Sequence, residues 1–164
     1  MDEGKFRQRV DDHYRVMANA KKNLRTSGRL QLGAALGLLS VAAVNAMQPE
    51  ESATVTAAVG GVLALASAGI ARVALAAGGS VQVEKQATTY LSRVRVLGLL
   101  LLLSGGAAGA SSTFIAEPAQ MSIVAAWVGL WLVDLGACAL GYMAATTLLR
   151  AFEQQRKKAT QKVQ

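Results

Sequence analysis

The chain has 164 residues, of which 52% are hydrophobic and only 16% are charged, and its formal net charge is +7. The apolar residues gather in four stretches, roughly 30–47, 53–77, 96–115 and 121–149. A helix needs about 20 mainly apolar residues to cross about 30 Å of hydrocarbon. Because a water-soluble fold of this size cannot bury four such stretches, the sequence excludes a soluble globular domain. It predicts an all-α, polytopic membrane protein with a four-helix transmembrane bundle.

The charges outside these stretches alternate in sign along the chain. Residues 1–29 carry eight Lys/Arg against four Asp/Glu, and the segments 79–95 and 150–164 are also basic, whereas the two remaining loops are acidic. Lys and Arg concentrate on the cytoplasmic side of membrane proteins. We therefore expect both termini and the 79–95 loop to be cytoplasmic. This topology accounts for the basic balance, so we expect membrane lipids as partners and no nucleic acid.

The segment before the first span has the pattern of an amphipathic helix over residues 4–28. Apolar residues recur at helical spacing at Phe6, Val10, Tyr14, Met17 and Leu24. Three placements are open for this N-terminal cytoplasmic helix: in the headgroup region, against a partner or the end of the bundle, or as a solvated lead-in. Ser27-Gly28 is the expected break before the first span.

Small residues mark the predicted contact faces of the spans, since helices in lipid associate by close backbone approach. They are Gly60, Ala64 and Ala68 in the second span and Gly105 and Gly109 in the third. The fourth span has Gly136 and Gly141. This pattern leaves open whether the contacts are within the bundle or between subunits. Trp127 and Trp131 are expected to lie in an aromatic belt at the membrane interface.

Arg72 and Asp134 are the two formal charges inside the predicted spans. Arg72 lies about 9 Å from the cytoplasmic end of its helix, and Asp134 about 24 Å, so a salt bridge between them is marginal. We expect Arg72 to extend to the headgroups, and Asp134 to be neutral or hydrogen-bonded within the bundle. A transport role for Asp134 is the minority alternative.

No residue pattern indicates catalysis or a metal. The chain has one histidine, His13, and one cysteine, Cys138, which cannot form an internal disulfide. Glycine-rich pieces lie within spans, where a phosphate-binding loop has no place. We therefore expect no enzyme, no catalytic residue, no metal and no cofactor.

Both ends of the chain resemble the Jagunal family of four-pass endoplasmic reticulum proteins. Arg9-Val10-Asp11-Asp12-His13-Tyr14 matches an Arg-Val-x-x-His-Tyr pattern before the first span, and Leu148-Leu149-Arg150-Ala151-Phe152 follows the last. The overall plan of four spans with cytoplasmic termini is also similar. The matching residues cover about a tenth of the chain, and its Ala/Gly-rich spans depart from the family's pattern.

The resemblance implies a non-enzymatic role in organising the endoplasmic reticulum or in early secretory traffic. On this hypothesis a basic amphipathic segment (1–29) and a basic tail (150–164) flank the bundle (30–149) and contact lipids or protein partners. The candidate contact residues are Arg9, His13, Tyr14, Arg156, Lys157 and Lys158. An accessory subunit of a larger membrane complex, for example in an organelle's energy-converting membrane, is the main alternative, and a small transporter using Asp134 ranks last.

Overall fold

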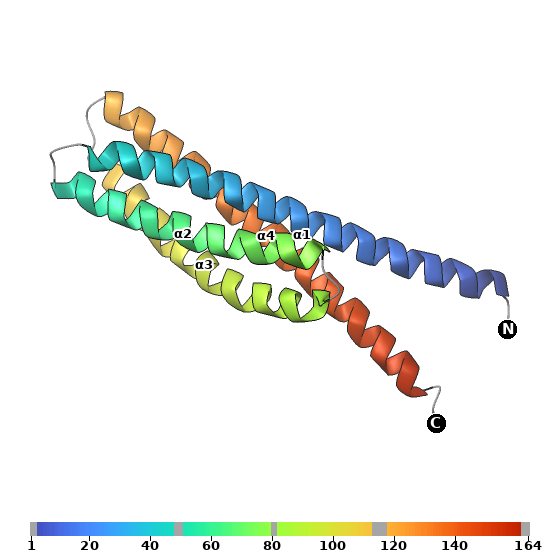
Figure 1. Cartoon of the computed structure of the whole chain (residues 1–164). Coiled ribbons are helices and arrows are strands. Elements are labelled where there is room, and N and C mark those ends of the chain that lie inside the picture. The colour runs from blue at the N-terminus through green and yellow to red at the C-terminus, as the bar shows by residue number, and fades with distance from the viewer. Residues whose placement is uncertain (1–2, 48–50, 80–81, 113–117, 162–164) are drawn as a thin grey trace.

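The computed structural model of the protein describes residues 3–47, 51–79, 82–112 and 118–161, and these form four helices. They are α1 (Glu3–Ala46), α2 (Glu51–Gly79), α3 (Val83–Ser112) and α4 (Pro118–Gln161). Each is packed against its two neighbours in a closed ring, α1 to α2, α2 to α3, α3 to α4 and α4 to α1 (Figure 1). Pro118 is the first residue of α4, where a helix has no need of its missing N–H. The predicted all-α four-helix bundle is confirmed.

All four helices are long and apolar enough to cross a membrane. The candidate spans within them are Val10–Ala46, Ala57–Ala77, Val83–Ser104 and Val124–Lys157. The protein is thus a multi-pass helical membrane protein. The first and fourth candidate spans, of 37 and 34 residues, are much longer than the 20 or so residues that a bilayer requires. The apolar windows alone therefore do not fix where the bilayer lies along the bundle.

Buried residues recur along each helix at alternating spacings of three and four. The buried positions are 24, 27, 31, 34 and 38 in α1, 60, 64, 67, 71 and 74 in α2, 83, 87, 90, 94, 97 and 101 in α3, and 134, 138, 141, 145 and 148 in α4. This is the seven-residue repeat of helices that interlock side chains along a shared seam. The repeat explains why long, nearly parallel helices pack as one bundle.

Helix α1 runs without interruption through Ser27 and Gly28, so the predicted break there is wrong. Both residues are buried. A Cβ on Gly28 would stand 3.0 Å from the Ala71 carbonyl oxygen and 3.1 Å from the Ala74 Cβ. Gly28 therefore provides close approach between α1 and α2, and packing outweighs the modest helix cost of glycine.

The start of α1 and the end of α4 lie at the same end of the bundle as the end of α2 and the start of α3, and α1 and α4 project beyond α2 and α3 there (Figure 1). We call this the terminal end. The three basic segments of the sequence are thus at one end, as the alternation of charge predicted. Met17 lies partly buried against the core, and the Gln155 amide approaches its sulfur at 4.0 Å, so α1 and α4 stay in contact past α2.

The two tryptophans face the bundle, contrary to the aromatic belt that we expected. Trp127 is 6% exposed, and its indole nitrogen lies 3.6 Å from where a Cβ on Gly60 would be. Trp131 donates a hydrogen bond from its indole N–H to the Leu101 carbonyl oxygen at 2.5 Å. Small residues on the facing helices leave room for the rings, and this favours insertion into the core over a place among lipids.

Candidate functional site: a buried polar layer

Polar side chains from all four helices meet in the centre of the bundle, on the side nearer the terminal end. The five residues are all at 0% exposure: Ser27, Gln31, Ser67, Tyr90 and Asp134. Two of their hydrogen bonds join helices that are diagonal to one another in the ring, Ser27 to Tyr90 and Ser67 to Asp134. We call this set, together with Cys138, the polar layer.

The first diagonal connection is built around Ser27. Its hydroxyl donates to the Ala137 carbonyl oxygen of α4 at 2.7 Å and lies 3.0 Å from the Tyr90 hydroxyl of α3. Gly141 lies one turn beyond Ala137 and is buried. A Cβ at Gly141 would overlap both the Tyr90 and the Ser27 hydroxyl oxygens. The absence of a side chain at this position is therefore what lets Ser27 and Tyr90 meet.

The second diagonal connection holds the charged residue of the layer. The Ser67 hydroxyl donates to Oδ2 of Asp134. One turn further along α4, the Gln31 amide nitrogen donates to the Cys138 sulfur at 3.2 Å. Oδ1 of Asp134 and Oε1 of Gln31 are buried acceptors without a hydrogen-bond donor among the described residues. The hydrogen bond within the bundle that we expected for Asp134 is present.

The layer is closed on the side away from the terminal end. Leu38, Leu63 and Trp127 lie there, each one or two turns beyond a member of the layer, and all are buried. Gly60 packs closely against these residues, since a Cβ on it would stand 3.6 Å from the Trp127 indole nitrogen and 3.8 Å from the Leu38 carbonyl oxygen. The next buried polar side chain of α1 on this side is Asn45, two turns beyond Leu38, so Leu38, Leu63 and Trp127 separate it from the layer.

The two charges predicted within spans lie apart, and the predicted packing residues of α2 face the bundle. Arg72 is exposed on α2 and makes no ion pair among the described residues, so Arg72 and Asp134 are not salt-bridged. Gly60 and Ala64 are buried against the bundle, and Ala68 is half-buried. These α2 contacts are within the chain rather than between subunits. Gly105 and Gly109 fall in α3, but their surroundings lie outside the described residues.

The predicted contact residues lie on the projecting helices. Tyr14 is 65% exposed, and its ring meets that of His13 edge to face, with centroids 6.4 Å apart. His13 is half-buried, and its Nε2 has no partner among the described residues. Lys157 is exposed. The side chains of Arg9 and Lys158 lie outside the described residues.

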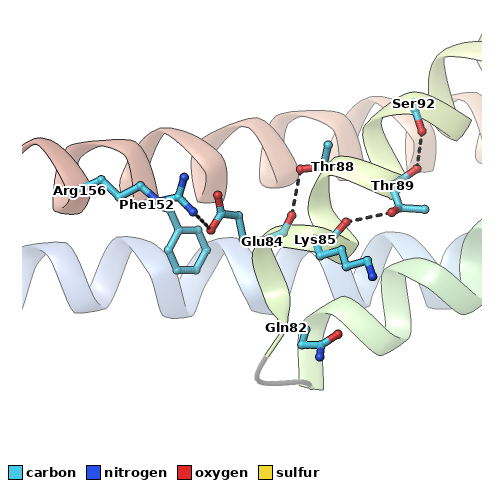
Figure 2. Close-up of a pocket in the computed structure, with 8 residues that line it drawn as sticks. All are labelled: Gln82, Glu84, Lys85, Thr88, Thr89, Ser92, Phe152 and Arg156. Carbon is cyan, nitrogen blue, oxygen red and sulfur yellow. Dashed lines mark hydrogen bonds and ion pairs between the residues drawn. The ribbon is translucent and has the colours of Figure 1, made fainter.

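Arg156 connects α4 to α3 at the terminal end. Its guanidinium donates to the Glu84 carboxylate at 2.9 Å, beside the ring of Phe152 (Figure 2). The pair borders an open hollow of about 750 Å³ that also has hydroxyls of Thr88, Thr89 and Ser92 on its wall. These three hydroxyls donate to backbone carbonyls of their own helix. The Arg156 side chain is 73% exposed in this pair, so the contact is weak and Arg156 stays accessible to solvent.

Sequence analysis missed Ser27, Gln31, Ser67 and Tyr90 as members of a site. A signal was present in α1, where Ser27 and Gln31 interrupt an apolar repeat that includes Leu24 and Leu38 at spacings of three, four and seven. Polar residues on the buried seam of a helix need partners on other helices. The identity of those partners depends on how the helices are arranged around the ring, which the repeat does not give.

The polar layer has the chemistry of a structural network. Among the described residues, no group of three or more His, Cys, Asp or Glu side chains gathers to hold a metal. What the layer does is satisfy polar groups across both diagonals, which selects one order and register of the four helices.

Comparison with family models, with curated proteins and with solved structures finds no match. The fold and the layer define the class of the molecule: a four-span helical membrane protein with a hydrogen-bonded core and two projecting helices.

Proposed function

We propose that this protein is a non-enzymatic membrane organiser of the endoplasmic reticulum and early secretory pathway. In this proposal the bundle is the membrane anchor, and the projecting part of α1 binds a cytosolic protein. The observation that carries the proposal is the place of the Arg-Val-x-x-His-Tyr pattern. It falls on the part of α1 that extends past α2 and α3, where Val10 is 36% and Tyr14 65% exposed.

Val10 and Tyr14 of this pattern do not pack into the core of the bundle. Further along the same face, Leu24 is fully buried and Met17 is partly buried against the core. The amphipathic face thus divides into an inner part that packs against the bundle and an outer part in which Val10 and Tyr14 are exposed. Exposed aromatic and apolar side chains beside charged ones are typical of protein contact surfaces.

Two alternatives have less support. An accessory subunit was expected to use small-residue faces for its neighbours, but Gly60 and Ala64 pack within the chain. A transporter centred on Asp134 needs a polar path, but Leu38 and Trp127 close the described core beyond the layer. The organiser proposal needs neither feature.

The proposal predicts that a single substitution on the projecting helix separates partner binding from membrane insertion. Tyr14→Glu places a charge in the exposed apolar face and is expected to reduce recovery of the partner at least about tenfold, the loss typical of an interface aromatic residue. The measurement is location of the tagged full-length protein in cells, with quantitative identification of the proteins that co-purify after gentle solubilisation.

Asn19→Glu is the matched control, because Asn19 is exposed on the same helix and the charge change is identical. It is expected to keep both location and partners. A reticular pattern with trafficking proteins that Tyr14→Glu loses and Asn19→Glu keeps supports the proposal. A mitochondrial or plastid pattern with one stoichiometric complex overturns it.

A further inference from the structure

The outer surface of the bundle changes from apolar to polar at one level. Large apolar side chains are exposed over residues 30–47, 59–65, 96–103 and 132–143. In the adjoining stretches toward the terminal end, 17–29, 66–77, 82–95 and 144–157, no described large hydrophobic side chain is exposed. Long apolar surface suits lipid, and polar surface suits water, so this level has the character of a membrane boundary.

Four exposed arginines lie at this level, on three helices: Arg29, Arg72, Arg93 and Arg95. Gly28 is packed against Ala71, and α1 and α2 are antiparallel, so Arg29 and Arg72 lie within about 3 Å of the same height. Ser27 meets Tyr90, and Arg93 and Arg95 follow Tyr90 by about 4.5 and 7.5 Å along the helix. We call these four residues the arginine belt.

Three arginines of the belt have no carboxylate partner among the described residues. Arg29, Arg72 and Arg93 make no ion pair among the described residues. The Arg95 guanidinium donates to the Tyr142 hydroxyl at 3.4 Å and lies 5.7 Å from the centroid of that ring. Tyrosine at the edge of an apolar band is typical of the headgroup region. Arg95 and Tyr142 together thus mark the same boundary on α3 and α4.

We propose that the arginine belt binds the phosphate groups of anionic phospholipids in the leaflet that faces the chain termini, and so sets the depth of the bundle. Guanidinium groups form paired hydrogen bonds with phosphate oxygens. Phosphates are the anions available at the edge of the hydrocarbon. The inference stands apart from the proposed function, since it concerns the anchor and not the projecting segment.

Helix lengths fit this depth. From the belt to the opposite end, Leu30–Met47 covers about 27 Å and Glu51–Arg72 about 33 Å, close to the thickness of about 30 Å. The parts of all four helices on the terminal side of the belt then stand in water, and we call them together the polar stub. Ser27 and Tyr90 lie at the phosphate level. The second span thus ends near Arg72 and the fourth near Tyr142, closer to the opposite end than hydropathy alone indicated.

Lipid selectivity tests the belt directly. The purified full-length protein is equilibrated with equal amounts of phosphatidylserine and phosphatidylcholine, and the retained lipids are counted by native mass spectrometry. We expect at least about fivefold enrichment of phosphatidylserine, since a basic residue near an anionic surface contributes about that factor. The triple variant Arg29→Gln, Arg72→Gln, Arg93→Gln is expected to lose the enrichment. It leaves the Arg95–Tyr142 contact in place.

The matched control removes three other exposed cations far along the stub: Arg15→Gln, Lys85→Gln, Lys157→Gln. It is expected to retain the enrichment. Equal loss in both variants means that net charge and not the belt selects the lipid, which overturns the proposal. No enrichment in the unchanged protein overturns it as well.

The depth itself is measured by labelling single introduced cysteines with a membrane-impermeant maleimide in open membranes. Thr26→Cys and Ser92→Cys, on the stub side of the belt, are expected to react, whereas Leu32→Cys and Leu99→Cys are expected to be protected. All four positions are exposed on the bundle surface, and the native Cys138 is buried. Protection of Thr26→Cys and Ser92→Cys, or rapid labelling of the two leucine positions, places the boundary elsewhere and refutes the belt.

Discussion

Replacing Gly141 with alanine is expected to lower the free energy of unfolding by about 2–4 kcal/mol. The added Cβ would overlap the hydroxyl oxygens of Tyr90 and Ser27. Either the helices separate or the buried Ser27–Tyr90 contact breaks and leaves polar groups unpaired. The measurement is unfolding in mild detergent, by heating and by titration with a denaturing detergent.

Gly136→Ala is the matched control on the same helix. Gly136 is exposed, and a Cβ there would have no atom within 4 Å. Alanine is the better helix former by up to about 1 kcal/mol, so Gly136→Ala is expected to leave stability unchanged or to raise it slightly. Equal stability of the two alanine variants would show that α1, α3 and α4 do not meet at Gly141 as closely as described.

Replacing Asp134 with lysine is expected to cost about 3 kcal/mol or more, or to prevent folding. The side chain is fully buried and is hydrogen-bonded by Ser67. An ammonium group has no acceptor capacity for the Ser67 hydroxyl, and it would bring an unpaired positive charge into the apolar core. Unfolding of the purified protein, and the yield of protein in membranes, measure the effect.

Two further variants separate the reasons for this loss. Thr147→Lys adds a lysine to an exposed position of α4 and is expected to be neutral. Asp134→Asn keeps an oxygen that accepts from Ser67 and removes the charge, so it is expected to stay within about 1 kcal/mol of the unchanged protein. If Asp134→Asn folds normally but abolishes an ion or proton flux in proteoliposomes, the structural role assigned to Asp134 is wrong and the transport alternative returns.

These two positions explain how an apolar bundle acquires a single arrangement. Helices coated with alanine, leucine and valine can pack in several registers at similar energy in lipid, where no hydrophobic force distinguishes them. Hydrogen bonds across both diagonals remove that degeneracy, because a shift of one turn leaves Ser27, Tyr90 and Asp134 without partners. The polar layer therefore serves specificity more than it serves total stability.

Much of the architecture was predictable from the chain, and the reasons are local. Four apolar stretches gave four helices, and alternating charge placed the basic segments at one end, as Figure 1 shows. The predicted hydrogen bond of Asp134 follows from the cost of an unpaired charge in lipid.

Two predictions, for Ser27-Gly28 and for Trp127, were wrong for an equally physical reason. Ser27-Gly28 has the composition of a break, but in the bundle the serine is a donor to α4 and the glycine is a close contact with α2. Tryptophan is a residue type typical of membrane interfaces, but Gly60 leaves room for Trp127 in the core. In each case the residue's use depends on a helix that is remote in sequence.

The sequence by itself determined the class of the protein, the number of its spans and the side of the bundle on which its charges gather, because these depend on hydropathy and charge summed along the chain. The tertiary structure alone decided which polar residues meet, where the arginines form a belt and which part of α1 projects. Those features depend on the relative height and rotation of four helices, and pairwise contacts between distant residues fix both.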